Sequence, residues 1–170
     1  ARCGDGHRQR TTRGGAELYE AYLARLRSEK SLELRTPILV ALARFQDPAL
    51  VARTVELAAS AEIPFNEMDD LLSGGQADPR LADRVYDEAV QRFAALVRKL
   101  GADRRIQLLR IGEALCSRHR RDQADRFFAD KLGGAPGIAT ARGHMREQID
   151  LCVARRAAQS AAVAEALAGT

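Results

Sequence analysis

Apolar residues recur at spacings of three and four along most of this chain. The clearest stripe steps by four, four, four, three and four residues, and it consists of Leu81, Val85, Ala89, Phe93, Leu96 and Leu100. Such spacings place side chains on one face of an α-helix. No stretch shows the sustained apolar and polar alternation of a β-strand. The pattern therefore predicts an all-α fold.

The same spacing predicts further helices on both sides of this stripe. Helical order is expected to begin near Ala16, and Pro37 indicates a kink or a late start of the second helix. The predicted apolar faces are, in chain order, Leu18, Tyr19, Tyr22, Leu23 and Leu26; Leu32, Leu34, Ile38, Leu42 and Phe45; Leu50, Val51, Val55 and Ala58; Ile106, Leu109, Ile111, Leu115 and Cys116; Ala124, Phe127, Phe128 and Leu132; and Ile138, Met145, Ile149, Cys152 and Val153.

Two sites carry the same signal for the start of a helix. Asp47 precedes Pro48 and Asp78 precedes Pro79, so each site offers a capping carboxylate followed by a proline at the first helical position. The two sites are 31 residues apart, a period within the range of helical repeat proteins. Both a compact bundle and an array of stacked helix pairs fit this pattern.

Other residues mark where shorter helices begin and end. Asn66 is predicted to cap a short helix that runs through Leu72, and Gly101 is predicted to end the long stripe. The segments 73–75 and 133–137 are rich in glycine and should interrupt the chain. In all, about seven or eight helices are expected.

The length of 170 residues suits one domain. Residues 1–15 lack an apolar period and are interpreted as a linker or a truncated edge. Residues 16–157 form the predicted helical domain, and residues 158–170 its frayed helix end or a tail.

The net charge of +4 raises the question of a nucleic-acid partner. Residues 1–15 account for +3 of it, and the remaining charges of both signs are interspersed as on solvated helix faces. No nucleic-acid partner is therefore predicted.

No apolar run is long enough to span a bilayer, so a soluble protein without a membrane partner is expected. The chain begins at Ala1 rather than at a methionine, which is compatible with a removed signal or upstream domain, and leaves a cytoplasmic or periplasmic location open.

The three cysteines, Cys3, Cys116 and Cys152, are an odd and widely spaced set without a C-x-x-C pair. This spacing argues against a disulfide framework and against a structural zinc site. Cys116 and Cys152 fall on apolar helix positions, where a free cysteine behaves as a small hydrophobic residue. Both are predicted to be buried thiols.

No catalytic or metal-binding motif is found. A zincin helix needs two histidines one turn apart with a glutamate between them, and His7, His119 and His144 are isolated. Cys116 lies near His119 in sequence, but no third group orients a nucleophilic pair there. No glycine cluster has a phosphate-binding fingerprint.

Two charged clusters have an ordinary structural interpretation beside a functional one. Glu67, Asp69 and Asp70 offer an acid pair or a cation site, but carboxylates in the first turn of a helix are favoured by its macrodipole. Arg118, Arg120 and Arg121 would suit a helix end and its exposed turn, with anion binding as the alternative. The structural interpretation is preferred for both clusters.

The segment Ala41–Leu57, which reads ALARFQDPALVARTVEL, resembles the helix-turn-helix signature of the C-terminal domain of puromycin-sensitive and endoplasmic-reticulum-type aminopeptidases. The stretches 16–27, 78–100, 112–117 and 149–154 are similar to other helices of that domain, so the resemblance covers most of residues 16–157. The segments Gly6–Gly15 and Glu62–Phe65 depart from the family pattern.

The resemblance implies a HEAT-like α-α superhelix of antiparallel helix pairs that covers the catalytic domain of a zinc-dependent aminopeptidase. In such enzymes this domain encloses the peptide cavity and shapes substrate access. The zinc ligands and the general base belong to the catalytic domain, so this chain is expected to have no cofactor, no catalytic or metal-binding residue and no turnover of its own. Its expected partners are that catalytic domain, on the same polypeptide, and the peptide substrate.

The sequence does not identify residues that contact the substrate. The alternative function is a stand-alone helical scaffold that binds a protein or peptide. A third function, nucleic-acid binding, would depend on the basic residues 1–15.

Overall fold

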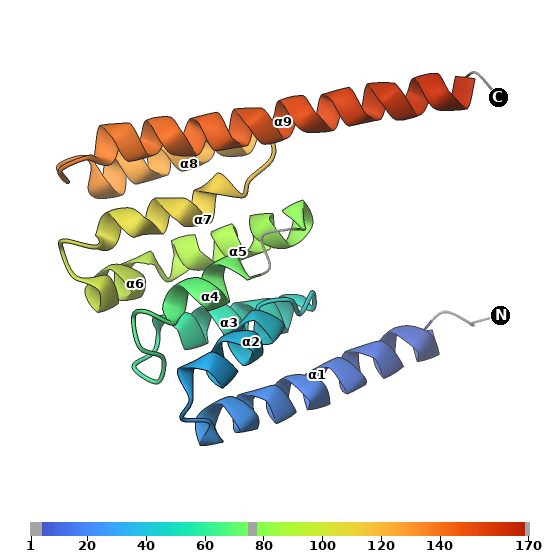
Figure 1. The fold of residues 1–170 in the computed structure, drawn as a ribbon, viewed down its shortest axis with the longest axis vertical. Helices are drawn as coiled ribbons and strands as arrows, with labels where there is room; N and C mark the ends of the chain where they lie inside the picture. The colour runs from blue at the N-terminus through green and yellow to red at the C-terminus, as the bar shows by residue number, and fades with distance from the viewer. Residues whose placement is uncertain (1–4, 75–77, 169–170) are drawn as a thin grey trace. The chain divides into compact units, whose positions relative to one another are not determined.

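The computed structural model describes residues 5–74 and 78–168, with only the backbone described for residues 5–14 and Pro79. Within these residues the chain forms helices α1 to α9 and one short 3-10 helix, and no strand (Figure 1). The predicted all-α class is confirmed. The chain separates into two compact units, residues 1–101 and residues 102–170, and each is described by itself.

The first unit is built around α3, which packs against α4, α5 and α6. Helix α2 contacts both α1 and α4, so the helices of this unit share a continuous core. Their bounds are α1 Asp5–Ser28, α2 Leu32–Leu42, α3 Pro48–Ala59, α4 Met68–Ser73, α5 Pro79–Gln91 and α6 Phe93–Leu100. The most deeply buried large side chains of this core are Tyr19, Leu26, Leu39, Leu42, Ile63, Leu71 and Leu96.

The second unit is built around α9, which packs against α8, α7 and the 3-10 helix η1. The bounds are η1 Arg105–Leu109, α7 Arg110–Glu113, α8 Arg118–Leu132 and α9 Ile138–Ala168. Its core includes Leu108, Leu109, Leu115, Phe128, Met145 and Ile149. Long helices α8 and α9 thus form a hairpin, joined at the predicted break over residues 133–137 (Figure 1).

Both predicted Asp-Pro starts are confirmed. The Asp47 carboxylate accepts hydrogen bonds from the backbone N–H of Ala49 at 2.9 Å and of Leu50 at 3.3 Å. Asp78 accepts from the N–H of Arg80 at 3.0 Å. These contacts satisfy N–H groups that the first turn of a helix leaves without an intrahelical partner.

Replacing Asp47 by Ala should lower the free energy of unfolding by about 1 kcal/mol, because two backbone donors of α3 lose their acceptor. Urea denaturation followed by circular dichroism measures the change. Asp47→Asn is the control and should retain most of the stability, since an amide oxygen also accepts these bonds. Equal losses for the two variants would contradict the capping role.

The stripe from Leu81 to Leu100 forms two helices rather than the single one expected. Arg92 separates α5 from α6 with dihedral angles of φ −100° and ψ 12°. Its N–H still donates to Glu88 O at 3.2 Å, and its guanidinium folds back onto the Glu88 carboxylate. The apolar face continues across this residue, so the periodicity alone does not reveal the break. The predicted stop at Gly101 is confirmed, with φ 74° and its N–H bonded to Val97 O.

The predicted cap at Asn66 is wrong. Helix α4 begins at Met68, and the preceding residue is Glu67, whose side chain makes no capping bond. The N–H of Glu67 instead donates to Pro64 O at 3.1 Å, which closes a turn over residues 64–67. Asn66 is exposed in that turn.

Helix α1 begins at Asp5, before the expected start near Ala16. Helix α9 continues through Ala168, which agrees with the helix-end alternative for the residues after 157. Helix α2 begins at Leu32 and continues through Pro37, so this proline does not delay its start.

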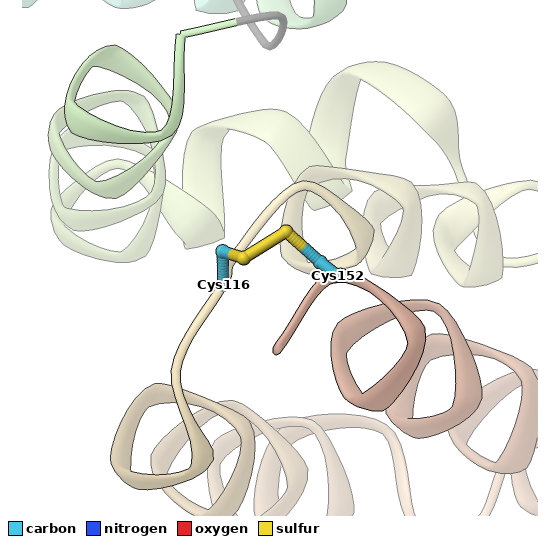
Figure 2. The surroundings of a disulfide bond; sticks show 2 residues. All are labelled: Cys116 and Cys152. Carbon is cyan, nitrogen blue, oxygen red and sulfur yellow. A yellow bond between two sulfur atoms is a disulfide. The ribbon is translucent and has the colours of Figure 1, made fainter. Parts of the chain in front are cut away.

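The prediction of free, buried thiols at Cys116 and Cys152 is wrong, because the two residues form a disulfide (Figure 2). Cys116 lies in the turn before α8 and Cys152 lies on α9, and both are half-buried. They are separated by 36 residues in sequence, but the α8–α9 hairpin returns the chain and brings their Cα atoms to 5.4 Å, within the usual range for a disulfide. Cys3 lies outside the described residues.

Candidate functional site

The histidines and cysteines considered for catalysis do not form a reactive group in the described residues. Cys116 is bonded to Cys152, so its thiol is not available to form a nucleophilic pair with His119, in agreement with the sequence-based interpretation. His144 Nδ1 lies 3.2 Å from the Glu113 carboxylate on an exposed surface. No three His, Cys, Asp or Glu side chains of the described residues gather where they could hold a metal ion. The side chain of His7 is not among the described side chains.

The acidic cluster is divided by the structure into two different environments. Asp69 and Asp70 lie in the first turn of α4, as the structural interpretation predicts. Burial is the main cause that raises the pKa of Asp70, and the neighbouring carboxylates of Asp69 and Glu67 add to it. Glu67 precedes the helix, is only 4% exposed, and faces Arg35 of α2.

Arg35 and Glu67 form a buried ion pair in the first unit. The guanidinium of Arg35 donates from Nε at 2.8 Å and from Nη2 at 2.7 Å to the two Glu67 oxygens. Arg35 Nη1 also donates to the carbonyls of Leu26 at 2.7 Å and Glu29 at 3.0 Å, where α1 ends. The hydrogen bonds to Glu67 raise the pKa of Arg35. The hydrogen bonds of this pair connect the end of α1, the start of α2 and the turn before α4.

Lys99 fixes the end of α3 in a similar way. Its ammonium group donates to Ala58 O at 2.5 Å and to Ser60 O at 2.7 Å. These carbonyls belong to the C-terminal end of α3, where a cation is favoured by the helix dipole. Burial lowers the pKa of Lys99 in spite of the nearby Glu67 carboxylate.

A groove of about 480 Å³ lies beside Lys99, and we call it the α3–α6 groove. Ile63 is 1% exposed and underlies it, whereas Phe65 is 45% exposed. Two cations line the groove: the half-buried ammonium group of Lys99 and the exposed guanidinium of Arg98, both on α6. The groove is lined by Ala59, Ser60, Ala61, Ile63, Phe65, Ala95, Arg98 and Lys99. It combines an apolar surface with positive charge, which suits an apolar side chain that has an anionic group close by.

Sequence reasoning did not find this groove. Its aromatic residue comes from the segment Glu62–Phe65, whose departure from the family pattern was the only signal. Phe65 follows Pro64 in an irregular turn, so no helical periodicity places its side chain.

A second groove of the first unit, of about 460 Å³, lies on α1 and α2. Its lining is largely apolar, with Leu18 51% exposed and the ring of Tyr22 in edge contact with Phe45. Arg44 is the one cation among its lining residues, which are Leu18, Tyr22, Pro37, Val40, Ala41, Arg44 and Phe45.

The arginine run lies at the start of α8. Ser117 caps this helix by accepting a hydrogen bond from Arg120 N at 3.2 Å. Cations in a first turn oppose the helix dipole, and acidic side chains offset that cost. The guanidinium of Arg121 contacts the Asp122 carboxylate at 2.8 Å and the Asp150 carboxylate of α9 at 2.7 Å. Arg121 of this run therefore contributes to the contact between α8 and α9.

Asp125 of α8 forms ion pairs with two arginines of α9. It accepts from Arg142 Nε at 2.8 Å and Nη2 at 2.6 Å, and from Arg146 at 3.3 Å. The hydrogen bonds with Arg142 are the main cause that lowers the pKa of Asp125.

This lowered pKa predicts how the second unit responds to acid. A carboxylate with a lower pKa in the folded than in the unfolded state contributes its full stability above the unfolded pKa and loses it as pH falls through the folded value. The contribution of Asp125 should therefore disappear as the pH falls below about 4. In the variant Asp125→Asn, the free energy of unfolding should fall less steeply with decreasing pH in this range. Urea denaturation at a series of pH values measures this dependence. An unchanged pH dependence would contradict this assignment.

No helix of the described residues combines the length and apolar character needed to cross a membrane.

No curated protein and no solved structure matches the chain significantly. The model of one family, described as the ERAP1-like C-terminal domain, matches residues 9–151. This match confirms the resemblance over residues 16–151, and it also includes residues 9–15 of the segment that the sequence pattern assigned to a linker or a truncated edge. Because it covers well over half of the 170 residues, the chain belongs to the ERAP1-like C-terminal domain family.

Proposed function

We propose that this chain is the C-terminal domain of a zinc-dependent aminopeptidase, in which it encloses the peptide cavity and shapes substrate access. The zinc and the groups that cleave the peptide would be supplied by a catalytic domain of the same polypeptide. The observation that carries the proposal is the family match over residues 9–151. Successive packed helices offer extended surfaces that contact a ligand without needing a reactive side chain.

Within this role, the α3–α6 groove is the surface that we assign to the peptide. Phe65 presents an exposed ring beside the buried Ile63, so an apolar peptide side chain gains contact there. Arg98 and the Lys99 ammonium group favour a carboxylate of the same peptide. The position of Lys99 is fixed by two backbone carbonyls, so its charge is held in place before a ligand binds.

Kinetics of the full-length polypeptide that carries this chain test the assignment. Phe65→Ala and Arg98→Ala should each raise KM for long peptides by about tenfold, the usual effect of removing a well-placed contact residue. Hydrolysis of an aminoacyl-p-nitroanilide, which is too short to reach the groove, should be unchanged. Glu56→Ala is the matched control, an exposed residue of α3 that does not line the groove.

Two results would count against the proposal. If both groove variants alter long and short substrates equally, the groove does not contact the peptide. If the purified 170-residue chain hydrolyses either substrate by itself, the catalytic groups are not on another domain, and the assigned role is wrong.

A further inference from the structure

The disulfide joins the residue before the start of α8 to α9 in the second unit. Cys116 immediately precedes Ser117, whose side chain caps α8. Cys152 lies on the last turn of α9 that is not fully exposed. Met145 and Ile149 are fully buried, Cys152 and Val153 are half-buried, and residues 154–168 are all exposed. The bond therefore holds the start of α8 against the last packed turn of α9 (Figure 2).

A polar contact joins the same two places. Arg121, in the first turn of α8, bonds the carboxylate of Asp150 at 2.7 and 3.0 Å, and Asp150 lies two residues before Cys152. Asp150 is about half exposed, so solvent weakens this ion pair. The covalent bond is the stronger of these two constraints between the start of α8 and the last packed turn of α9.

The second unit is small. It comprises residues 102–170, and the exposed part of α9 adds no core to it. Units of this size bury a limited apolar surface and commonly need a cross-link. Disulfides form and persist in oxidising compartments, and are rare where thioredoxin and glutathione keep thiols reduced.

We propose that this chain acquires its stable form in an oxidising, extracytoplasmic compartment, and that the second unit is its redox-dependent part. Formation of the bond removes two protons and two electrons from the thiols of Cys116 and Cys152. The acceptor is the disulfide of a thiol oxidoreductase or of oxidised glutathione, which becomes two thiols. A dithiol reductant reverses the reaction and frees the start of α8 and the end of α9. This inference does not depend on the proposed peptidase role.

Thiol mapping tests the bond itself. The chain, incubated with oxidised glutathione, is alkylated with iodoacetamide in denaturant and digested for mass spectrometry. We expect Cys116 and Cys152 in one linked peptide pair without reduction, and both alkylated after reduction. Equal alkylation of both residues before and after reduction would overturn the proposal.

Hydrogen exchange tests the consequence. Reduction should speed exchange in residues 120–124 and 146–153 on the order of 100-fold, since their protection depends on the closed hairpin, while α3 and α5 remain unchanged. The variant with Cys116→Ser and Cys152→Ser is the control and should not respond to the reductant. A response in this variant, or none in the native chain, would overturn the assignment.

Fractionation of the source cells tests the compartment. An antibody against the chain should detect it outside the cytoplasm, with the Cys116–Cys152 bond formed. A cytoplasmic protein with both thiols reduced would contradict the inference.

Discussion

Replacing Glu67 by Ala should lower the free energy of unfolding by about 3–5 kcal/mol, because the substitution leaves the Arg35 guanidinium partly buried without its counter-ion. Only 5% of the Glu67 side chain and 15% of the Arg35 side chain are exposed. The same guanidinium bonds the last carbonyls of α1, so its displacement would also loosen the contact between α1 and α2. Urea denaturation followed by circular dichroism measures the loss.

A second ion pair in the same unit provides the control. Arg27 and Glu62 also join α1 to the segment before α4, with two hydrogen bonds at 2.8 and 3.1 Å. Their side chains are 57% and 36% exposed, so solvent screens the pair. Glu62→Ala should therefore lower the free energy of unfolding by only a small part of the loss expected for Glu67→Ala. Similar losses for both variants would show that burial does not set the strength of these pairs.

Removing the disulfide should destabilise the second unit by about 2–4 kcal/mol, the usual range for a bond that closes a loop of several tens of residues. Cys116 and Cys152 enclose all of α8, the turn that follows and half of α9. Without the bond the unfolded chain gains conformational freedom, while the folded hairpin keeps only its noncovalent contacts. Replacing both cysteines by Ser and measuring urea denaturation under non-reducing conditions tests this value.

The reductant provides an internal comparison for this prediction. Reduction of the native chain should reproduce the midpoint of the double variant, because both lack the same bond. The prediction fails if the double variant and the oxidised native chain share one midpoint.

Local signals in the sequence predicted much of the fold. Asp47 and Asp78 cap helices because a carboxylate followed by proline satisfies the first turn without help from distant residues. The apolar stripe through Val85 and Leu96 is buried as its spacing indicates. Gly101 ends α6 because its positive φ is easily adopted without a side chain.

Two of the failures arise from contacts between residues that are distant in sequence. Cys116 and Cys152 are brought together only by the α8–α9 hairpin, and Arg35 meets Glu67 across 32 residues. Local reasoning treated the cysteines as hydrophobic residues and Glu67 as part of a first turn. The α3–α6 groove was missed for the same reason, since Phe65 comes from an irregular turn and Lys99 from a helix far along the chain.

The coding sequence upstream of the codon for Ala1 tests the central claim most directly. The account predicts, in the same reading frame, an H-E-x-x-H motif with a second glutamate one helix later, because zinc and the general base must come from a catalytic domain on this polypeptide. A start codon directly before Ala1, with no such motif in the frame, would contradict the assignment of this chain to a zinc aminopeptidase.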